Sequence, residues 1–246
     1  MRLTRIHVPG KLGAGTQVDL PAQAGAHLTR VLRLEAGAPL TLFNGAGGEF
    51  SATLLINGKQ AAARVTRHDP VERESPLRMT LLQGVARGER MDLIVQKATE
   101  LGVSRIVPVL AERSVVRVDA KQSERKREHW QAIAISACEQ CGRNRVPEIG
   151  APIALGDALA TLPADSLRCL LAADGGEALA DVAARGARRP IVLLIGPEGG
   201  LTDNERDFAG ANGFTACRLG PRVMRTETAG LAALAVLQAI AGDFNS

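Results

Sequence analysis

The sequence predicts an α/β protein in which a domain built on a mostly parallel sheet follows a small β-barrel. Residues 1–68 hold short apolar runs between turn residues, and beyond residue 77 strand patterns alternate with helical ones. The stretch 69–77 contains two prolines and four charged residues, a composition typical of a linker. We therefore expect a barrel over 1–70, a linker over 71–77 and an α/β domain over 78–246.

The first part should contain strands and one short helix. Asn44-Gly45 and Asn57-Gly58 are dipeptides typical of tight turns, and apolar runs lie on either side of them. A short helix carrying Arg30 and Arg33 is predicted over 26–34. Strands are predicted over 3–8, 40–43, 49–56 and 61–66.

The second part alternates between the two patterns, which indicates a parallel sheet covered by helices on both faces. Ligands of such sheets bind at the carboxyl ends of the strands, so the loops after residues 172, 195 and 219 should form the site. Strands are predicted over 79–85, 106–110, 167–172, 191–195 and 215–219. Helices are predicted over 90–101, 123–139, 178–185, 203–211 and 228–241.

The composition indicates an anionic partner. The chain has 246 residues, 46% of them apolar, so it can bury a large core, and 30 basic residues, most of them arginine, give a pI of about 9.2. Only 2% of the residues are aromatic, which excludes binding of nucleic acid led by base stacking. Arginine supplies part of what aromatic rings would, because its guanidinium binds phosphate and also stacks on bases.

Cysteine usage and the lack of a secretory or membrane-spanning run indicate a reduced, cytoplasmic setting. Cys138 and Cys141 have the spacing of a metal or redox pair, but no second pair lies at ligand spacing, so we expect neither metal nor disulfide. The histidines lie away from the three loops, and a structural role, or one that faces the anionic partner, is expected for each. They are His7, His27, His68 and His129.

A glycine-rich loop, 196–200, follows the strand predicted over 191–195. Its glycines allow a ligand to approach the backbone closely and expose amide groups. Thr202 and Glu205 have capping-box spacing, so a helix should begin directly after the loop. The loop matches neither the Walker nor the dinucleotide-binding pattern, and a plain tight turn is the alternative interpretation.

A second polar loop precedes the last helix. Arg222, Arg225 and Glu227 lie within a stretch of six residues. Placing three charged side chains so close together costs free energy unless they pair with each other or with a ligand. Thr226 or Thr228 could cap the helix, but capping leaves the three charged residues unexplained.

Seven strings occur in order along nearly the whole chain. They are Met-Arg-x-x-Arg at the start, His27-Leu28-x-x-Val31-Leu32-Arg33-Leu34, Gln96-Lys97-Ala98-Thr99-Glu100-Leu101-Gly102-Val103, Glu112-Arg113-Ser114-Val115, Glu139-Gln140-Cys141-Gly142-Arg143, Gly196-Pro197-Glu198-Gly199-Gly200 and Arg225-x-Glu227-Thr228-Ala229. Together they resemble the bacterial small-subunit (16S) ribosomal RNA uridine-N3 methyltransferase family of the SPOUT class.

The resemblance implies a PUA-like barrel that grips RNA and a SPOUT domain threaded into a trefoil knot around S-adenosylmethionine (SAM). It also implies a homodimer whose active cleft forms where two knots meet, acting on 16S ribosomal RNA or the small subunit. The cofactor-binding residues that it implies are Leu171, Ala172, Ile195, Gly196, Pro197, Glu198, Gly200, Leu219, Gly220, Val223, Met224, Thr228 and Ala229.

The implied reaction needs no metal, because SAM carries its methyl on a sulfonium. Uridine N3 attacks well only as its proton leaves. We expect Arg225 to stabilise the charge that develops on O2 or O4, and either Glu227 or a bound water to accept the proton. The alternative for Glu227 is a purely structural pairing with Arg225 or Arg222.

The target uridine should leave its stack to reach the cofactor. For Arg143 and Asn144 the alternative to an RNA contact is a structural role at a helix end. Competing functions are 2′-O-ribose or guanine-N1 methylation, a non-catalytic RNA-binding assembly factor, and nucleotide binding at 196–200. Expected RNA contacts are Arg2, Arg5, Arg30, Arg33, Arg143, Asn144 and Arg222.

Overall fold

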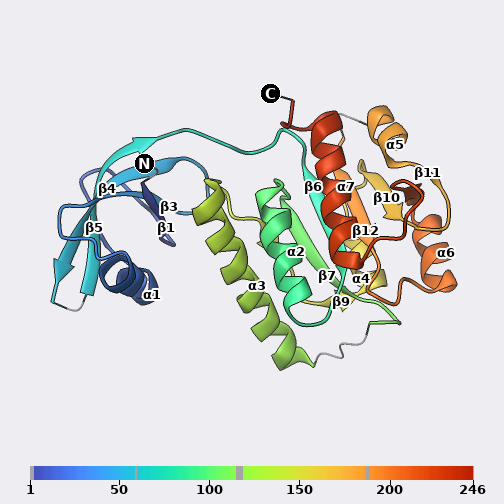
Figure 1. Ribbon diagram of the computed structural model, residues 1–246, viewed down its shortest axis with the longest axis horizontal. Helices are drawn as coiled ribbons and strands as arrows, with labels where there is room; N and C mark the ends of the chain where they lie inside the picture. The colour runs from blue at the N-terminus through green and yellow to red at the C-terminus, as the bar shows by residue number, and fades with distance from the viewer. Residues whose placement is uncertain (1–2, 59, 115–118, 187–188, 246) are drawn as a thin grey trace. The chain divides into compact units, whose positions relative to one another are not determined.

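In the computed structural model the chain divides into two units by its internal contacts (Figure 1). The first unit comprises Met1–Glu74 and Cys138–Val146, and the second comprises Ser75–Ala137 and Pro147–Ser246. The structure describes residues 3–58, 60–114, 119–186 and 189–245. The division after Glu74 falls inside the predicted linker, whereas no feature of the sequence indicated that 138–146 joins the first unit.

The first unit is built on a five-stranded sheet with the order β1-β3-β4-β5-β2. β1 is parallel to β3, and the other pairs are antiparallel. Phe50, Ala52 and Leu54 alternate inward along β4 and join the core of the unit, as the two-residue period of a strand requires. The small β-domain is thus confirmed. Its strands are β1 (Thr4–His7), β2 (Gln17–Asp19), β3 (Pro39–Phe43), β4 (Glu49–Asn57) and β5 (Gln60–Asp69).

The helix of the first unit begins and ends earlier than predicted. It consists of α1 (Ala22–Ala26) and a π-helical turn, His27–Val31. A Cβ at Gly25 would lie 2.9 Å from Cβ of Ala61, so the glycine allows α1 to lie directly against β5. This packing joins segments far apart in the chain, so a local pattern does not reveal it.

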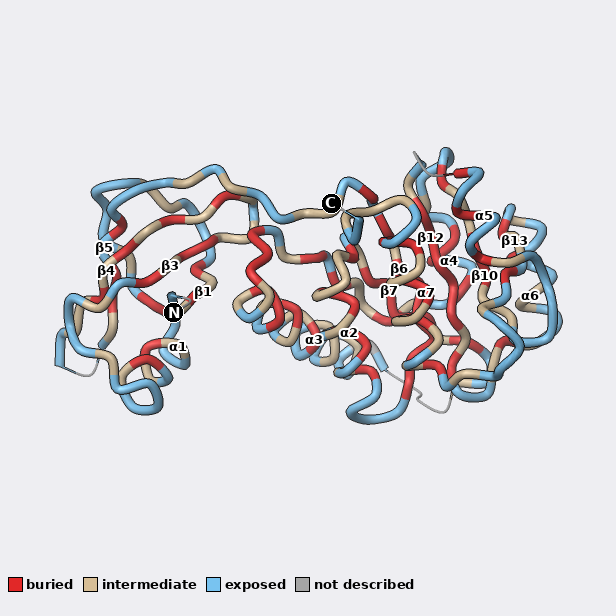
Figure 2. Tube along the Cα trace, turned by 45° about the horizontal axis from the view of Figure 1, so that its top comes forward, coloured by how far each residue is buried: buried red, intermediate tan, exposed pale blue. Residues whose placement is uncertain are grey.

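The second unit contains an eight-stranded sheet in which every pair is parallel. Its order is β11-β13-β10-β12-β6-β7-β8, and β9 pairs with β7. All five residues of β12 are buried, and Figure 2 shows this central strand as an unbroken buried run. The strands are β6 (Met79–Gly84), β7 (Arg105–Leu110), β8 (Glu148–Ile149), β9 (Ile153–Ala154), β10 (Leu167–Leu171), β11 (Glu177–Ala178), β12 (Ile191–Ile195) and β13 (Thr215–Arg218).

Helices cover both faces of this sheet, as predicted. Val192 and Leu194 of β12 belong to one core with Ala209 of α6, whereas Ile195 lies beside Gly230 of α7. No helix in the described ranges is long and apolar enough to cross a bilayer. The helices are α2 (Glu89–Glu100), α3 (Ala120–Cys141), α4 (Leu155–Ala160), α5 (Leu179–Arg185), α6 (Asp203–Ala211) and α7 (Thr226–Ala241).

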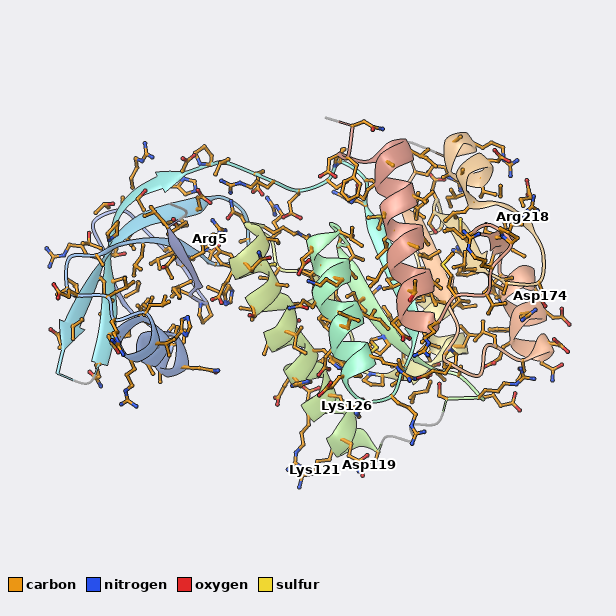
Figure 3. The ribbon with its side chains drawn as sticks, in the orientation of Figure 1. Arg5, Asp119, Lys121, Lys126, Asp174 and Arg218 are labelled. Carbon is orange, nitrogen blue, oxygen red and sulfur yellow. The ribbon has the colours of Figure 1, made fainter. Side chains whose placement is uncertain are left out.

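The long helix α3 begins three residues before its predicted start. The carboxylate of Asp119 accepts a hydrogen bond of 2.8 Å from the backbone N–H of Gln122, which caps the first turn (Figure 3). Farther along, Trp130 is buried and its Nε1 donates to Oδ1 of Asp92 over 3.1 Å. The cap therefore sets the start of α3, and the tryptophan fixes its packing on α2.

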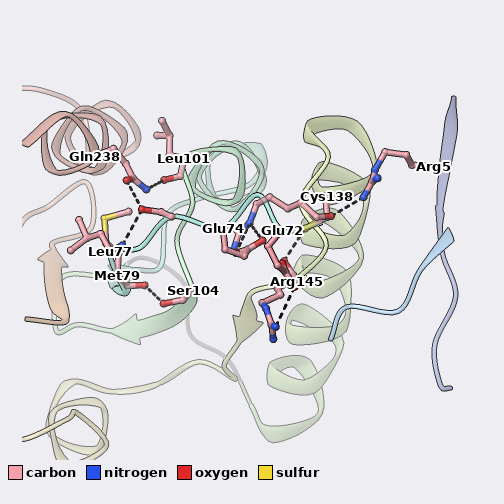
Figure 4. A network of polar contacts seen from close by, with 12 residues as sticks. Arg5, Glu72, Glu74, Leu77, Met79, Leu101, Ser104, Cys138, Arg145 and Gln238 are labelled. Carbon is pink, nitrogen blue, oxygen red and sulfur yellow. Dashed lines mark hydrogen bonds and ion pairs between the residues drawn. The ribbon is translucent and has the colours of Figure 1, made fainter. Parts of the chain in front are cut away.

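A buried polar network holds 138–146 in the first unit (Figure 4). Arg5 donates from Nη1 to Oε2 of Glu49 over 2.5 Å and from Nη2 to Oδ1 of Asn144 over 2.6 Å. Arg143 donates from Nη2 to Oε2 of Glu74 over 2.5 Å. Arg5, Arg143 and Asn144 are at most 8% exposed. The structure therefore gives these three buried, hydrogen-bonded side chains a role inside the unit, and their contact with RNA stays a prediction.

Acid should weaken the first unit through Glu49. Burial alone would raise the pKa of this carboxyl, but hydrogen bonds from Arg73 and Arg5 outweigh it and hold the pKa below its ordinary value of 4.5. Glu49 therefore stabilises the fold above that value, and the contribution is lost as the pH falls through the lowered pKa. Urea titrations from pH 7 to pH 3 should show Glu49→Gln losing less stability on acidification than the wild type. The control is Glu35→Gln, which removes an exposed carboxylate of the same unit and should leave the urea midpoint at pH 7 unchanged. Equal losses of stability on acidification in Glu49→Gln and the wild type would contradict the prediction.

Candidate active site

Three loops of the second unit line one cavity of about 390 Å³. They follow β10, β12 and β13, which are parallel neighbours in the sheet, so all three leave it at the same edge. The volume lies within the range of small-molecule sites, about 300–1,000 Å³. Arg90 of α2 and Arg206 of α6 complete the lining, and the sequence had indicated neither.

The structure brings together nearly all residues expected to bind the cofactor. Thr228 is the exception, since it is exposed on the first turn of α7 and lies outside the lining. Arg225 and Glu227, expected to take part in the chemistry, also line the cavity. The other lining residues from the expected set are Leu171, Ala172, Ile195, Gly196, Pro197, Glu198, Gly200, Leu219, Gly220, Val223, Met224 and Ala229.

The glycine-rich loop is held at both ends. The predicted capping box is confirmed, because the hydroxyl of Thr202 accepts from the Glu205 N–H while Oε2 of Glu205 accepts from the Thr202 N–H over 2.8 Å. On the opposite side, a Cβ at Gly84 would lie 2.3 Å from the nitrogen of Pro197. Only a glycine at position 84 allows the loop to pass so close to β6. In the sequence, the one indication of this role was that Gly84 lies near the end of a predicted strand.

Thr226 ties the start of α7 to this loop. Its hydroxyl donates to the carbonyl of Gly196 over 2.6 Å and accepts from Nε2 of Gln83 over 2.9 Å. The expectation that a threonine caps α7 is corrected, because Arg225 occupies the capping position and makes no capping bond from its side chain. The buried hydroxyl of Thr226 instead joins three segments, β6, the glycine loop and α7.

Thr226→Val should destabilise the protein by about 1–3 kcal/mol, because the carbonyl of Gly196 loses its buried donor while the side-chain shape is kept. Urea denaturation measures the change. Thr228→Val is the matched control, since this exposed threonine lies on the same turn and its replacement should change the free energy of unfolding by less than about 0.5 kcal/mol. Equal effects of the two substitutions would contradict the role assigned to the Thr226 hydroxyl.

Two carboxylates and one arginine meet at the cavity wall. Nη1 of Arg90 donates to Oε1 of Glu198 over 2.9 Å, and Nε of Arg90 lies 3.8 Å from Oε1 of Glu227. Burial would raise the pKa of Glu198, but hydrogen bonds from the Arg87 N–H and from Arg90 outweigh it, and the pKa falls below its ordinary value. Glu198 is therefore held as a carboxylate at neutral pH.

The two carboxylate oxygens of Glu227 differ in their contacts. Its side chain is 13% exposed, and Oε2 is buried with no hydrogen-bond partner among the described residues. In the described part of the chain Glu227 forms its ion pair with Arg90, and the alternative pairing with Arg222 or Arg225 does not occur there. An unpartnered buried acceptor costs free energy, so the orientation of this carboxylate has to be maintained by its surroundings.

The remaining candidate RNA contacts are accessible where the structure describes them. Arg30 and Arg33 are exposed in the first unit, and Arg33 has a φ of 53°, in the left-handed region. Arg222 is exposed and lines the cavity. Arg2 lies outside the described residues.

Cysteines and histidines lie outside the cavity lining. Burial raises the pKa of the Cys138 thiol to about 12, so this thiol is protonated at neutral pH. His7 donates its backbone N–H to Glu139 over 2.9 Å, and Nε2 of His129 lies 3.0 Å from Oδ2 of Asp92. His7 and His129 thus make contacts within the protein, and a structural or RNA-facing role for the four histidines stays a prediction.

Comparisons with known proteins agree with this architecture. A family model described as an RNA methyltransferase domain matches residues 73–238, and one described as an RNA methyltransferase PUA domain matches residues 20–66. Ribosomal RNA small subunit methyltransferase E of Bacillus subtilis is 31% identical over 219 residues, covering 86% of this chain and 85% of that protein.

Two solved structures are similar along the whole chain. A Legionella pneumophila protein in complex with SAM has a TM-score of 0.93 and 40% identity, covering 99% of this chain and 100% of the other. Ribosomal RNA small subunit methyltransferase E of Neisseria gonorrhoeae, bound to SAM, has a TM-score of 0.90 and 39% identity, with the same coverage. On these matches the chain belongs to the ribosomal RNA small subunit methyltransferase E family.

Proposed function

We propose that this protein transfers a methyl group from SAM to N3 of a specific uridine in 16S ribosomal RNA. One observation carries the proposal: the glycine-rich loop and the turn holding Arg225 and Glu227 line the same cavity. Relatives solved with SAM support the cofactor, and relatives named as small-subunit ribosomal RNA methyltransferases support the substrate.

The residues of the cavity fit SAM. Leu171, Ile195 and Leu219 offer apolar surface suited to an adenine ring. Gly196 and Gly220 leave the backbone open to close approach, and a Cβ at Gly220 would meet nothing within 4 Å. When bound, SAM supplies an electrophilic methyl on a positively charged sulfur.

Glu227 is placed to accept the proton of uridine N3, directly or through a bound water. N3 is a weak acid flanked by two carbonyls and attacks well only as its proton leaves. The side chain of Glu227 lines the cavity that would hold the methyl donor and is 13% exposed, so its carboxylate lies close to where the base would bind.

Arg225 is placed to stabilise the charge that develops on the uracil ring. Its side chain is exposed at the cavity, from the capping position of α7. Loss of the N3 proton spreads negative charge onto O2 and O4. A guanidinium beside either oxygen would therefore be worth more in the transition state than in the ground state.

The first unit would grip the RNA, with Arg30 and Arg33 as exposed cations, and the target uridine would leave its stack to reach the second unit. We extend the proposal to a cytoplasmic homodimer. Val223 lines the cavity and is 81% exposed, an apolar surface that a second copy would cover. Light scattering tests the dimer, and the knot implied by the resemblance stays a prediction.

The test is to incubate the protein with labelled SAM and small subunits lacking the modification, and to map methylated nucleosides by mass spectrometry. We expect one 3-methyluridine in 16S ribosomal RNA. A methyl on a ribose oxygen or on guanine N1 would replace the proposal with another methylation, and SAM that neither binds nor reacts would indicate an assembly factor. ATP competing with SAM would indicate nucleotide binding at the glycine loop.

A further inference from the structure

Arg90 joins the two acidic side chains of the cavity, although they come from segments far apart in the chain. It lies in the first turn of α2, whereas Glu198 belongs to the glycine loop and Glu227 to the first turn of α7. Its guanidinium contacts both carboxylates, at 2.9 Å and 3.8 Å. Its side chain remains 43% exposed and lines the cavity.

The helix itself does not explain an arginine at this position. A cation in the first turn of a helix opposes the helix dipole, which favours acidic residues there, such as Glu89 and Asp92 in the same turn. Two carboxylates close together also repel each other, and a cation between them offsets this repulsion. The contacts with Glu198 and Glu227 thus explain why an arginine stands at position 90.

Arg90 makes the two oxygens of Glu227 unequal. Oε1 faces the guanidinium, whereas Oε2 is buried without a partner among the described residues. A planar guanidinium held by Glu198 fixes the direction of its Nε, and so restrains the rotation of the carboxylate that faces it. Arg90 therefore holds the Glu227 carboxylate in one orientation at the cavity wall.

We propose that Arg90 is a positioning residue that fixes the orientation of the Glu227 carboxylate at the cavity wall, where this carboxylate would accept the N3 proton of the target base. The inference rests on the proposed function for the identity of that proton. Arg90 acts through Glu227, and Glu198 anchors Arg90.

A double-mutant cycle tests the inference. Arg90→Ala should lower kcat by about 30-fold while the Kd for SAM changes less than about threefold, because orientation is lost and the cofactor loops remain. Glu227→Gln should lower kcat at least as much, and the double variant should be no slower than Glu227→Gln alone. Arg90→Lys keeps the charge but reaches only one carboxylate, so it should recover part of the lost rate.

Arg87→Ala is the matched control. It removes the same charge from an exposed neighbour whose contact with Glu198 uses only the backbone N–H, so kcat should stay within about twofold. Additive losses in the double variant, or a loss confined to KM or to the Kd for SAM, would overturn the inference.

A crystal structure of Arg90→Ala gives a readout independent of activity. We expect the Glu227 carboxylate to turn from its wild-type orientation, and an unchanged orientation would overturn the inference even if the wild type methylates no RNA. A wild-type enzyme that marks another atom would instead count against the proposed function. The two failures are therefore distinguishable.

Discussion

Gly196→Val should abolish measurable SAM binding, raising the Kd by about 100-fold or more, while the protein stays folded. A Cβ at Gly196 would lie 3.0 Å from the nitrogen of Leu201 and 3.1 Å from the carbonyl carbon of Gly200. The branched side chain must therefore displace the loop or enter the cavity that the loop lines. Either movement removes backbone and shape complementarity that together contribute several kcal/mol to binding a ligand of this size. Isothermal titration with SAM measures the effect.

The control for this substitution is Gly210→Val. Gly210 is exposed on α6, and a Cβ there would meet nothing within 4 Å. This variant should bind SAM like the wild type. Thermal unfolding followed by circular dichroism should show that both variants fold. Retained SAM affinity in Gly196→Val would remove the glycine loop from the binding site.

Arg225→Ala should lower kcat by about 100-fold or more, with the Kd for SAM changed by less than about twofold. The guanidinium is asked to stabilise charge that exists only as N3 loses its proton, and deleting one such donor costs about 10²–10³ in rate. In the described part of the chain its side chain has no hydrogen bond or ion pair, so the substitution breaks no contact that holds the fold. Single-turnover methyl transfer to small subunits measures the rate.

Arg222→Ala provides the contrast. Arg222 is exposed on the same loop and is proposed to contact RNA, so its loss should raise KM for the RNA substrate and leave kcat near the wild-type value. An unchanged kcat in Arg225→Ala would show that another group stabilises the uracil oxygens. A rise in KM alone would make Arg225 a further RNA contact.

Elements with a strong local signal could be predicted from the sequence. The residues of β12 and α6 match the predicted ranges, because a continuous apolar run marks the strand and a capping box marks the start of the helix. β8, β9 and β11, of two residues each, were not predicted, and nor was α4. Such short elements have no period to detect, and the three short strands form because a neighbouring strand supplies their hydrogen bonds.

For the site, the sequence by itself determined which loops carry it, since glycines, prolines and charged residues after apolar strands are local signals. Only the tertiary structure decided which charged groups meet there. It buried Arg5 and Arg143 in a polar network and brought Arg90 to Glu198 and Glu227. The physical reason is that the sign and type of a side chain are local properties. Its partner is determined by packing between segments far apart in the chain, 69 residues for Arg143 and Glu74 and 108 for Arg90 and Glu198, which no local pattern records.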